Sequence, residues 1–182
     1  MDAIALLKTD HRSVEQLFQQ FENVGDRAFS TKAKVVTQIV RELSVHAEIE
    51  ETLFYPAAAK AAAQTKSMVL ESLEEHLGVK RILADLEKME PTDERFDAKV
   101  TVLIEQVRHH VSEEEEDLFP KVGGGLSHDR LDELGDEMDK AKAVVATRPH
   151  PHAPDTPPAN VVAGLVSGVI DRAKDVVDHV NP

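Results

Sequence analysis

Two side chains that prefer water occupy a stripe of the sequence where a helix would place apolar ones. Within residues 36–53, steps of three and four residues mark one face of a helix, and this face contains His46 and Glu50. A carboxylate that leaves water without a partner is very costly, so buried carboxylates are normally paired, neutralised or bound to a metal. The pattern therefore predicts a buried partner for Glu50. The residues on this face are Val36, Ile39, Leu43, His46, Glu50 and Leu53.

A second pair, His110 and Glu114, repeats this arrangement later in the chain. Two further histidines, His11 and His76, replace apolar residues on the buried faces of two other predicted helices. His76 follows His11 by 65 residues, and the second pair follows the first by 64. This spacing indicates one helical hairpin used twice, which would bring all six side chains to the same height of a bundle.

The chemistry of these six side chains points to a metal site. The sequence has no cysteine, so a metal must be bound by nitrogen and oxygen atoms. Imidazole combined with carboxylate suits iron, manganese, zinc or copper better than calcium or magnesium. We expect the two glutamates to bridge two ions, which leaves positions for water, an oxo or hydroxo bridge, dioxygen or peroxide. The predicted ligands are His11, His46, Glu50, His76, His110 and Glu114.

The alternative interpretation is a core of buried histidine–glutamate salt bridges without metal. A single core histidine is more often a satisfied polar residue than a ligand. The convergence of six such residues at one level favours the metal. Three roles are open to Tyr55, whose counterpart in the second half is Phe119: a hydrogen bond to a ligand, an additional ligand, or packing.

The other histidines carry weaker signals. His109 has a glutamate four residues later but lies off the buried face, so we expect it to be solvated. His150 and His152 lie in a proline-rich segment and are interpreted as linker residues, and His128 and His179 show no pattern.

The composition favours helices as the elements that position the six side chains. Alanine, leucine, valine, glutamate and lysine dominate the periodic segments, and aromatic residues make up only 4%. We predict an all-α protein, an up-down-up-down four-helix bundle with short loops. Pro56 is expected to end or kink the second helix. The predicted helices cover residues 2–24, 30–54, 65–89 and 92–119.

An additional helix and a tail follow the bundle. A glycine turn at 122–127 leads to a fifth helix that begins after Ser127 as its cap, so residues 1–146 form the bundle with a flanking helix. Residues 147–160 are a Pro-rich linker and 161–182 a short amphipathic helix. Gly164 and Gly168 would let this last helix pack closely on the bundle or on a second copy of the chain, as a homo-oligomer.

Charge and hydropathy exclude several classes of partner. The net charge of -13 would repel phosphate backbones, so we expect no nucleic-acid partner. Membrane association is not expected, since no apolar stretch reaches transmembrane length and the start of the chain does not resemble a signal peptide. The sequence predicts a cytoplasmic protein.

At these residues the sequence resembles the hemerythrin-like, HHE cation-binding family. The matching pattern is His11, then "HAEIE", then His76, then "HVSEE", and it covers about residues 1–120. The resemblance implies a four-helix bundle around two non-haem iron ions with an oxo or hydroxo bridge. It also implies a small-molecule ligand, O2, H2O2 or NO, and a role in the response to oxidative or nitrosative stress.

Two departures from the oxygen-carrying members alter this expectation. Those members have a second histidine on the third helix and an aspartate ligand on the fourth. Here Lys80 follows His76 by four residues, and the fourth helix offers Glu114. A more carboxylate-rich site favours higher oxidation states of iron, so we do not expect reversible oxygen carriage.

Three hypotheses of function follow. The leading one is a diiron protein that senses or consumes peroxide, dioxygen or nitric oxide, with a catalase-like enzyme as one form of it. The second is an iron-binding sensor or buffer without turnover, which signals through the tail. A zinc or manganese hydrolase ranks third, because no separate nucleophile or substrate pocket is evident.

Overall fold

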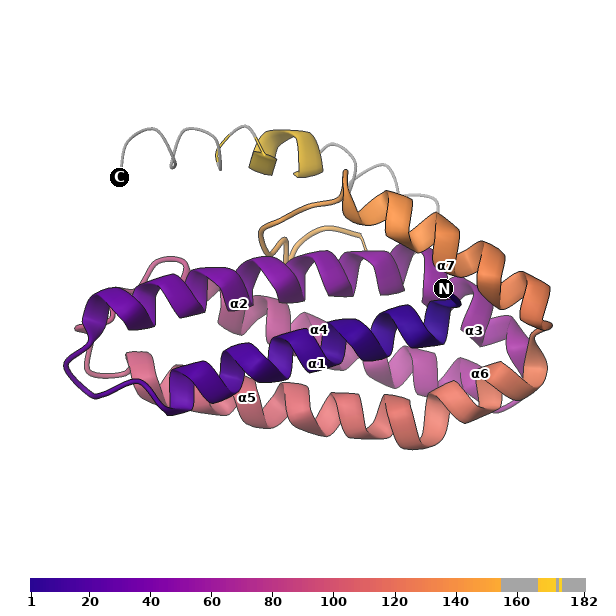
Figure 1. Cartoon of the computed structure of the whole chain (residues 1–182), viewed down its shortest axis with the longest axis horizontal. Coiled ribbons are helices and arrows are strands. Elements are labelled where there is room, and N and C mark those ends of the chain that lie inside the picture. The colour runs from indigo at the N-terminus through magenta and orange to yellow at the C-terminus, as the bar shows by residue number, and fades with distance from the viewer. Residues whose placement is uncertain (155–166, 173, 175–182) are drawn as a thin grey trace.

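The computed structural model describes residues 1–154, 167–172 and 174. Within this part of the chain the regular elements are all helical, as predicted. Four long helices lie side by side along the molecule and alternate in direction (Figure 1). They are α1 (Ala3–Glu22), α2 (Phe29–Ile49), α4 (Thr65–Leu86) and α5 (Phe96–Glu113).

Side chains of the sequence mark several helix ends. Asp2 is the N-cap of α1, where its carboxylate accepts a hydrogen bond from the amide of Ala5 at 2.8 Å. The predicted fifth helix is α7 (His128–Lys142), and the hydroxyl of Ser127 accepts from the amide of Arg130 at 3.2 Å. Helix α7 packs against α1 and α2, and so covers one flank of the bundle (Figure 1).

Of the two outcomes predicted for Pro56, an end or a kink of the second helix, the end does not occur. Helix α2 passes into a π-helical turn, η1 (Glu50–Phe54), and continues as α3 (Tyr55–Ala61), with Pro56 in its first turn. The amide of Tyr55 donates to the carbonyl of Glu50, five residues earlier, and this wider turn relieves the clash between a proline ring and the preceding turn.

The second half of the bundle has the same construction. Helix α5 passes into a π-helical turn, η2 (Glu114–Leu118), and continues as α6 (Phe119–Gly125). The predicted glycine turn at 122–127 is therefore helical up to Gly125. A Cβ atom at Gly125 would lie 2.2 Å from the carbonyl oxygen of Ala61, so this glycine permits α6 to pack closely on α3.

Two apolar clusters fill the bundle, one on each side of the level of the predicted metal ligands. The first surrounds α3, α6 and the start of α1, and Phe54 and Phe119 meet edge to face in it with ring centroids 5.5 Å apart. The second includes Phe18 and Phe96 and fills the opposite end. The polar level thus lies between two apolar clusters.

Gly135 on α7 packs closely against the backbone at the start of α1, and a small substitution can test this packing. A Cβ atom there would lie 2.2 Å from the carbonyl oxygen of Met1 and 2.9 Å from the amide nitrogen of Ala3. We expect Gly135→Ala to lower the free energy of unfolding by about 1–3 kcal/mol, because the backbone of α1 must move. The control is Gly124→Ala in α6, where the added methyl meets nothing within 4 Å and should raise stability by about 0.5–1 kcal/mol. Equal urea midpoints for the two variants would contradict this packing.

The described part of the tail folds back onto the end of α7. Residues 167–172 are helical, and the buried carboxylate of Asp171 accepts hydrogen bonds from the amides of Thr147 and Arg148 at 3.2 and 3.1 Å. A Cβ atom at Gly168 would lie 2.1 Å from the carbonyl oxygen of Val144, as expected for a close approach. Gly164 and most of the predicted 161–182 helix lie outside the described residues.

A search of the helices in the described residues finds none that is both long and apolar enough to cross a membrane.

Candidate metal centre

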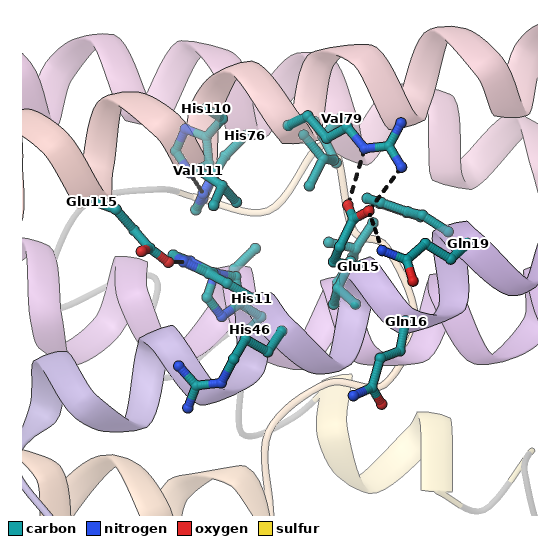
Figure 2. A pocket seen from close by; sticks show the side chains of 17 residues that line it. His11, Glu15, Gln16, Gln19, His46, His76, Val79, His110, Val111 and Glu115 are labelled. Atoms are coloured by element: carbon teal, nitrogen blue, oxygen red, sulfur yellow. Dashed lines mark hydrogen bonds and ion pairs between the residues drawn. The ribbon is translucent and has the colours of Figure 1, made fainter.

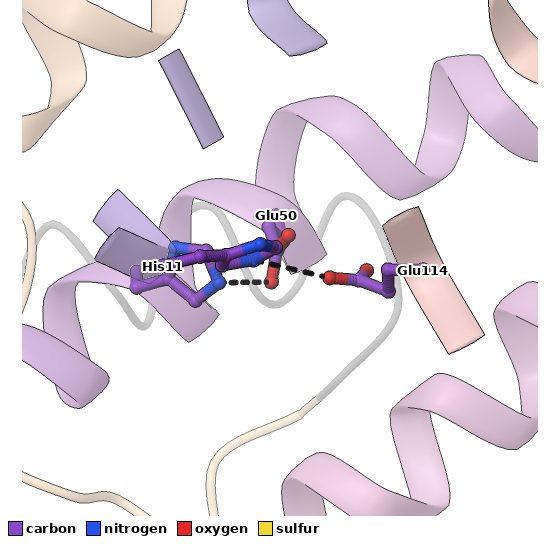
Figure 3. Close-up of side chains that lie close together, drawn as sticks. His11, Glu50 and Glu114 are labelled. Carbon is purple, nitrogen blue, oxygen red and sulfur yellow. Dashed lines mark ion pairs between the residues drawn. The ribbon is translucent and has the colours of Figure 1, made fainter. Parts of the chain in front are cut away.

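Each of the four long helices contributes one histidine to a buried cluster. All four histidines and the two predicted glutamates are buried, and they lie at one level of the bundle. Figure 3 shows His11, Glu50 and Glu114 converging from different helices. The structure thus brings together all six residues that the sequence predicts. They are His11, His46, Glu50, His76, His110 and Glu114.

The six side chains divide into two groups that share a carboxylate. Potential ligand atoms of the first group lie within 4.8 Å of one another, and the same holds for the second. Glu50 belongs to both, so one carboxylate is common to the two groups. The first group is His11, His46, Glu50 and Glu114, and the second is Glu50, His76 and His110.

The distances around each glutamate support a bridging position. Glu50 Oε2 lies 3.1 Å from His46 Nε2 and 3.4 Å from His76 Nε2, which belong to different hairpins. Glu114 Oε2 lies 3.4 Å from His11 Nε2 and 3.5 Å from His110 Nε2. Each carboxylate therefore faces one histidine of each hairpin.

Unpaired buried atoms at this level test whether a metal fits. Four inward-facing atoms have no hydrogen-bond partner, although buried polar atoms are nearly always paired. Three of them lie 3.1–3.4 Å from an oppositely charged group of the same cluster without hydrogen-bond geometry. Nitrogen and oxygen lone pairs that converge in this way suit a divalent ion of the iron or zinc type. The atoms are His11 Nε2, His46 Nε2, Glu50 Oε1 and Glu114 Oε2.

Without a metal the site holds protons tightly. Burial lowers the pKa of His46, but the charge of Glu50 and the contact with Asp10 outweigh it and raise the pKa to about 10. The pKa of His76 rises to about 9, because its contacts with Glu50 and Glu51 also outweigh burial. Burial acts to raise the pKa of Glu50, yet His46 and His76 bring it well below its usual value.

An outer carboxylate lies behind each of the four histidines, and three of the four accept or share a hydrogen bond with the imidazole. Each imidazole directs Nε2 inward and Nδ1 toward a carboxylate of a neighbouring helix, as Figure 2 shows for His11 and Glu115. A carboxylate at Nδ1 favours the tautomer with its proton there, which leaves the Nε2 lone pair for a metal. The Nδ1-to-oxygen distances are 2.8 Å for His11–Glu115, 3.7 Å for His46–Asp10, 3.0 Å for His76–Glu51 and 2.7 Å for His110–Glu75.

The four outer carboxylates form a closed ring that follows the internal repeat. Every outer carboxylate is the chain neighbour of a predicted ligand but faces a histidine of a different helix. The order is α1 to α2, η1 to α4, α4 to α5 and η2 to α1. Glu75 follows Asp10 by 65 residues and Glu115 follows Glu51 by 64. Our sequence reasoning missed these four residues, although the same spacing that revealed the ligands also relates them.

Lysines neutralise two of the outer carboxylates. Lys80 stands where the oxygen carriers have a histidine, but its ammonium group lies 2.6 Å from Glu51 and not at the centre. Lys142, at the end of α7, lies 2.5 Å from Asp10. These contacts keep the outer carboxylates charged in a largely buried setting.

Replacing one outer carboxylate should weaken metal binding without removing a ligand. We expect Glu75→Gln to lower the affinity for zinc or iron about 10–100-fold, because His110 loses the charged acceptor that orients it. The control is Glu74→Gln, since Glu74 is the exposed neighbour on the same helix. Competition with a chelator measures both affinities. Equal affinities would show that the outer carboxylate does not support the site.

The π-helical turns place consecutive glutamates on the inside of the bundle. Each turn begins at a predicted ligand, Glu50 or Glu114. Because the wider turn shifts the helix register, Glu51 is buried beside His76 and Glu115 reaches His11. A regular α-helix would separate consecutive side chains by about 100°.

The hydroxyl of Tyr55 contacts two of the predicted ligands, so this side chain does more than pack against the site. Its hydroxyl donates to Glu114 Oε1 at 2.9 Å and lies 3.1 Å from His76 Nε2. Burial and the charges of Glu114 and Glu50 raise the pKa of this phenol well above its usual value. The counterpart Phe119 stacks on His11 with ring centroids 5.8 Å apart, so the two halves differ at this position.

The remaining histidines that the structure describes lie away from the centre. His109 is exposed and contacts Glu113 at 3.3 Å, as predicted. His150 lies 2.9 Å from Asp171 in the docked tail, while His128 and His152 are exposed. His179 lies outside the described residues.

Comparison with known proteins gives an independent view of the chain. The family model of the hemerythrin HHE cation binding domain matches residues 2–122. An uncharacterized hemerythrin-like protein of Schizosaccharomyces pombe is 29% identical over 170 residues, which cover 93% of this chain and 83% of that protein.

Two further matches differ in how much of each protein they cover. A Nostoc protein named DNA nickase is 27% identical over 143 residues, 79% of this chain but only 40% of that protein. A crystal structure of a hemerythrin HHE cation binding domain-containing protein from Mycobacterium kansasii gives a TM-score of 0.68 at 22% identity. It covers 79% of this chain and 86% of that chain, and it shows that the fold is shared.

Proposed function

The chain belongs to the hemerythrin HHE cation-binding family, and from this premise we propose that its six convergent side chains hold two non-haem iron ions. The observation that carries the proposal is the pair of ligand groups that share Glu50, with unpaired nitrogen and oxygen atoms directed inward. Four histidines and two glutamates leave coordination positions open on two six-coordinate ions. When bound, the iron pair would supply one- or two-electron redox chemistry toward peroxide, dioxygen or nitric oxide.

The residues of the chain would prepare this chemistry in three ways. The outer carboxylates fix the orientation of the imidazoles, and two apolar clusters border the site on both sides. The Tyr55 hydroxyl, 2.9 Å from Glu114, can hold a proton at the centre or, as a phenolate, become an additional ligand. The charge balance of two bridging glutamates favours ferric ions, which argues for consumption or sensing of oxidants rather than reversible oxygen carriage.

Reaction of the iron-loaded protein with small oxidants tests this function. We expect the visible spectrum of the iron-loaded protein to change after it is mixed with hydrogen peroxide, dioxygen or nitric oxide. Release of oxygen from peroxide would identify catalase-like turnover. Zinc-loaded protein is the control, because zinc has no redox chemistry. If none of the three species alters the spectrum or is turned over, the proposal fails.

A specific chain of contacts favours an iron-binding sensor as the second candidate. His46 faces Asp10 at 3.7 Å, Asp10 contacts Lys142 at 2.5 Å, and the carbonyl of Lys142 accepts from Arg172 of the docked tail at 3.1 Å. Fixing His46 by a metal would therefore act on the element that holds residues 167–172.

Hydrogen exchange in the tail distinguishes a sensor from a purely reactive centre. For a sensor, zinc binding should slow exchange at residues 167–172, and Lys142→Met should remove most of this effect. Lys140→Met, an exposed lysine on the same helix, is the control. Exchange in the tail that is identical with and without metal would remove this candidate.

A further inference from the structure

A cavity of about 450 Å³ lies beside the cluster and is bordered by all four histidines. Figure 2 shows His11, His46, His76 and His110 along one side of it, and Val79 and Glu15 along the other. Glu50, Glu114 and Tyr55 do not line this cavity. The centre therefore has a carboxylate side, which faces the α3–α6 end, and an open side, where the imidazoles meet the cavity.

Apolar side chains form most of the wall of this cavity. They come from all four long helices, so the apolar surface surrounds the space rather than covering one side of it. An ionic ligand would find few charged partners along this wall. The apolar lining residues are Val14, Phe18, Leu43, Ala47, Val79, Val107 and Val111.

Two of the charged groups at the rim, Arg108 and Glu15, are paired with each other. Arg108 donates to both oxygens of Glu15, at 3.0 and 2.9 Å, and to Glu22 at 2.8 Å. Its guanidinium also lies 5.9 Å from the centre of the Phe18 ring. Arg12, also at the rim, is exposed and donates to the hydroxyl of Thr9 at 2.9 Å. Two arginines and two glutamates line the cavity, so their formal charges cancel, and Arg108 is neutralised by two carboxylates. This balance gives no net attraction for a negatively charged ligand.

The size of the cavity exceeds the needs of a diatomic molecule. One water molecule occupies about 30 Å³ of the liquid, and pockets that bind small organic molecules measure roughly 300–1,000 Å³. A volume of about 450 Å³ falls within the second range.

We propose that this cavity binds an uncharged, largely apolar organic molecule with one polar end against the histidines. The inference rests on the proposed function and deepens it, since it names the substrate class of the same centre: an organic hydroperoxide. The apolar body would contact the valines and Phe18, and the oxygen end would face the imidazoles.

Binding of an unreactive alcohol tests this without any iron. The probe is 2-phenylpropan-2-ol, and calorimetry on zinc-loaded protein measures its affinity. We expect saturable binding at one site with a negative change in heat capacity, the mark of apolar burial. Phenylacetate, of similar size but charged, should bind at least about ten times more weakly, because its carboxylate must leave water.

Variants that fill the cavity locate the binding site. Val79→Phe should weaken binding of the alcohol at least tenfold, and so should Val111→Phe, which starts from a half-buried side chain and is easier to accommodate. Val102→Phe is the control, since Val102 is 44% exposed on the same helix as Val111 and lies outside the cavity. Unfolding curves show which variants are folded.

Three results would overturn the inference: no saturable binding to the parent protein, unchanged binding in both cavity variants, or tighter binding of phenylacetate than of the alcohol. The two proposals fail separately. A protein that reacts with hydrogen peroxide but does not bind the alcohol contradicts only the organic substrate. A protein that binds the alcohol but is inert toward all oxidants when loaded with iron contradicts only the proposed function.

Discussion

Glu50→Ala is expected to lose most of its iron. Glu50 is fully buried, faces one histidine of each hairpin, and belongs to both ligand groups. Loss of an outer-shell partner typically weakens metal binding about 10–100-fold, so removal of a shared ligand should cost about 100-fold or more. Both ions should be affected, because the two groups have this carboxylate in common.

Iron content of the purified variant measures this effect. The control is Glu42→Ala, since Glu42 is an exposed carboxylate on the same helix and should leave iron content unchanged. Circular dichroism establishes that the Glu50 variant is helical, so that loss of metal is not merely loss of fold. A folded Glu50→Ala protein with the iron content of the parent would contradict a shared bridging ligand.

The metal-free protein should lose stability as the pH rises above neutrality. The pKa of His46 is raised from 6.5 to about 10 and that of His76 to about 9. A group whose pKa is higher in the folded than in the unfolded protein contributes its full stabilisation of the fold at a pH below the unfolded pKa. This contribution is lost as the pH rises through the folded pKa. Each unit corresponds to about 1.4 kcal/mol, so stability should fall by several kcal/mol between about pH 6.5 and 10.

Glu50 determines how the stability of the metal-free protein changes at acid pH. Its pKa is lowered, so its stabilising contribution is present above its unfolded value of 4.5 and is lost as the pH falls through its folded pKa. The metal-free protein should therefore be most stable between about pH 5 and 6.5. Urea unfolding with a chelator at pH 6, 8 and 9.5 measures this, and His46→Gln should flatten the alkaline limb. A parent protein equally stable at pH 6 and 9.5 would contradict the buried charge pairs.

Sequence periodicity was sufficient for the fold and for the convergence of six side chains. The steps of three and four residues identify the buried face of each helix, and the repeat of 64 or 65 residues places the marked positions at one height. The family match confirms the resemblance drawn from His11, His46, His76 and His110. Ser127 as a cap was predicted from local chemistry alone, and α7 begins there.

Features that depend on contacts between helices were not predicted. A π-helical turn has no clear residue preference, so an end or a kink was predicted at Pro56 and the end of the fourth helix before Pro120, although α3 and α6 continue beyond these prolines. The outer carboxylates were missed because Glu51 and Glu115 would leave the buried face in a regular helix. The glycines at 123–125 resemble a turn in sequence, yet Gly125 serves the packing of α6 on α3.

Metal content and the optical spectrum of the protein purified without added metal test the central claim most directly. The account predicts about two irons per chain, with the near-ultraviolet and visible absorption of an oxo-bridged ferric pair, both lost in the double variant His46→Ala, Glu50→Ala. Zinc, or no metal, with a double variant that folds as stably as the parent, would contradict an iron centre at these six residues.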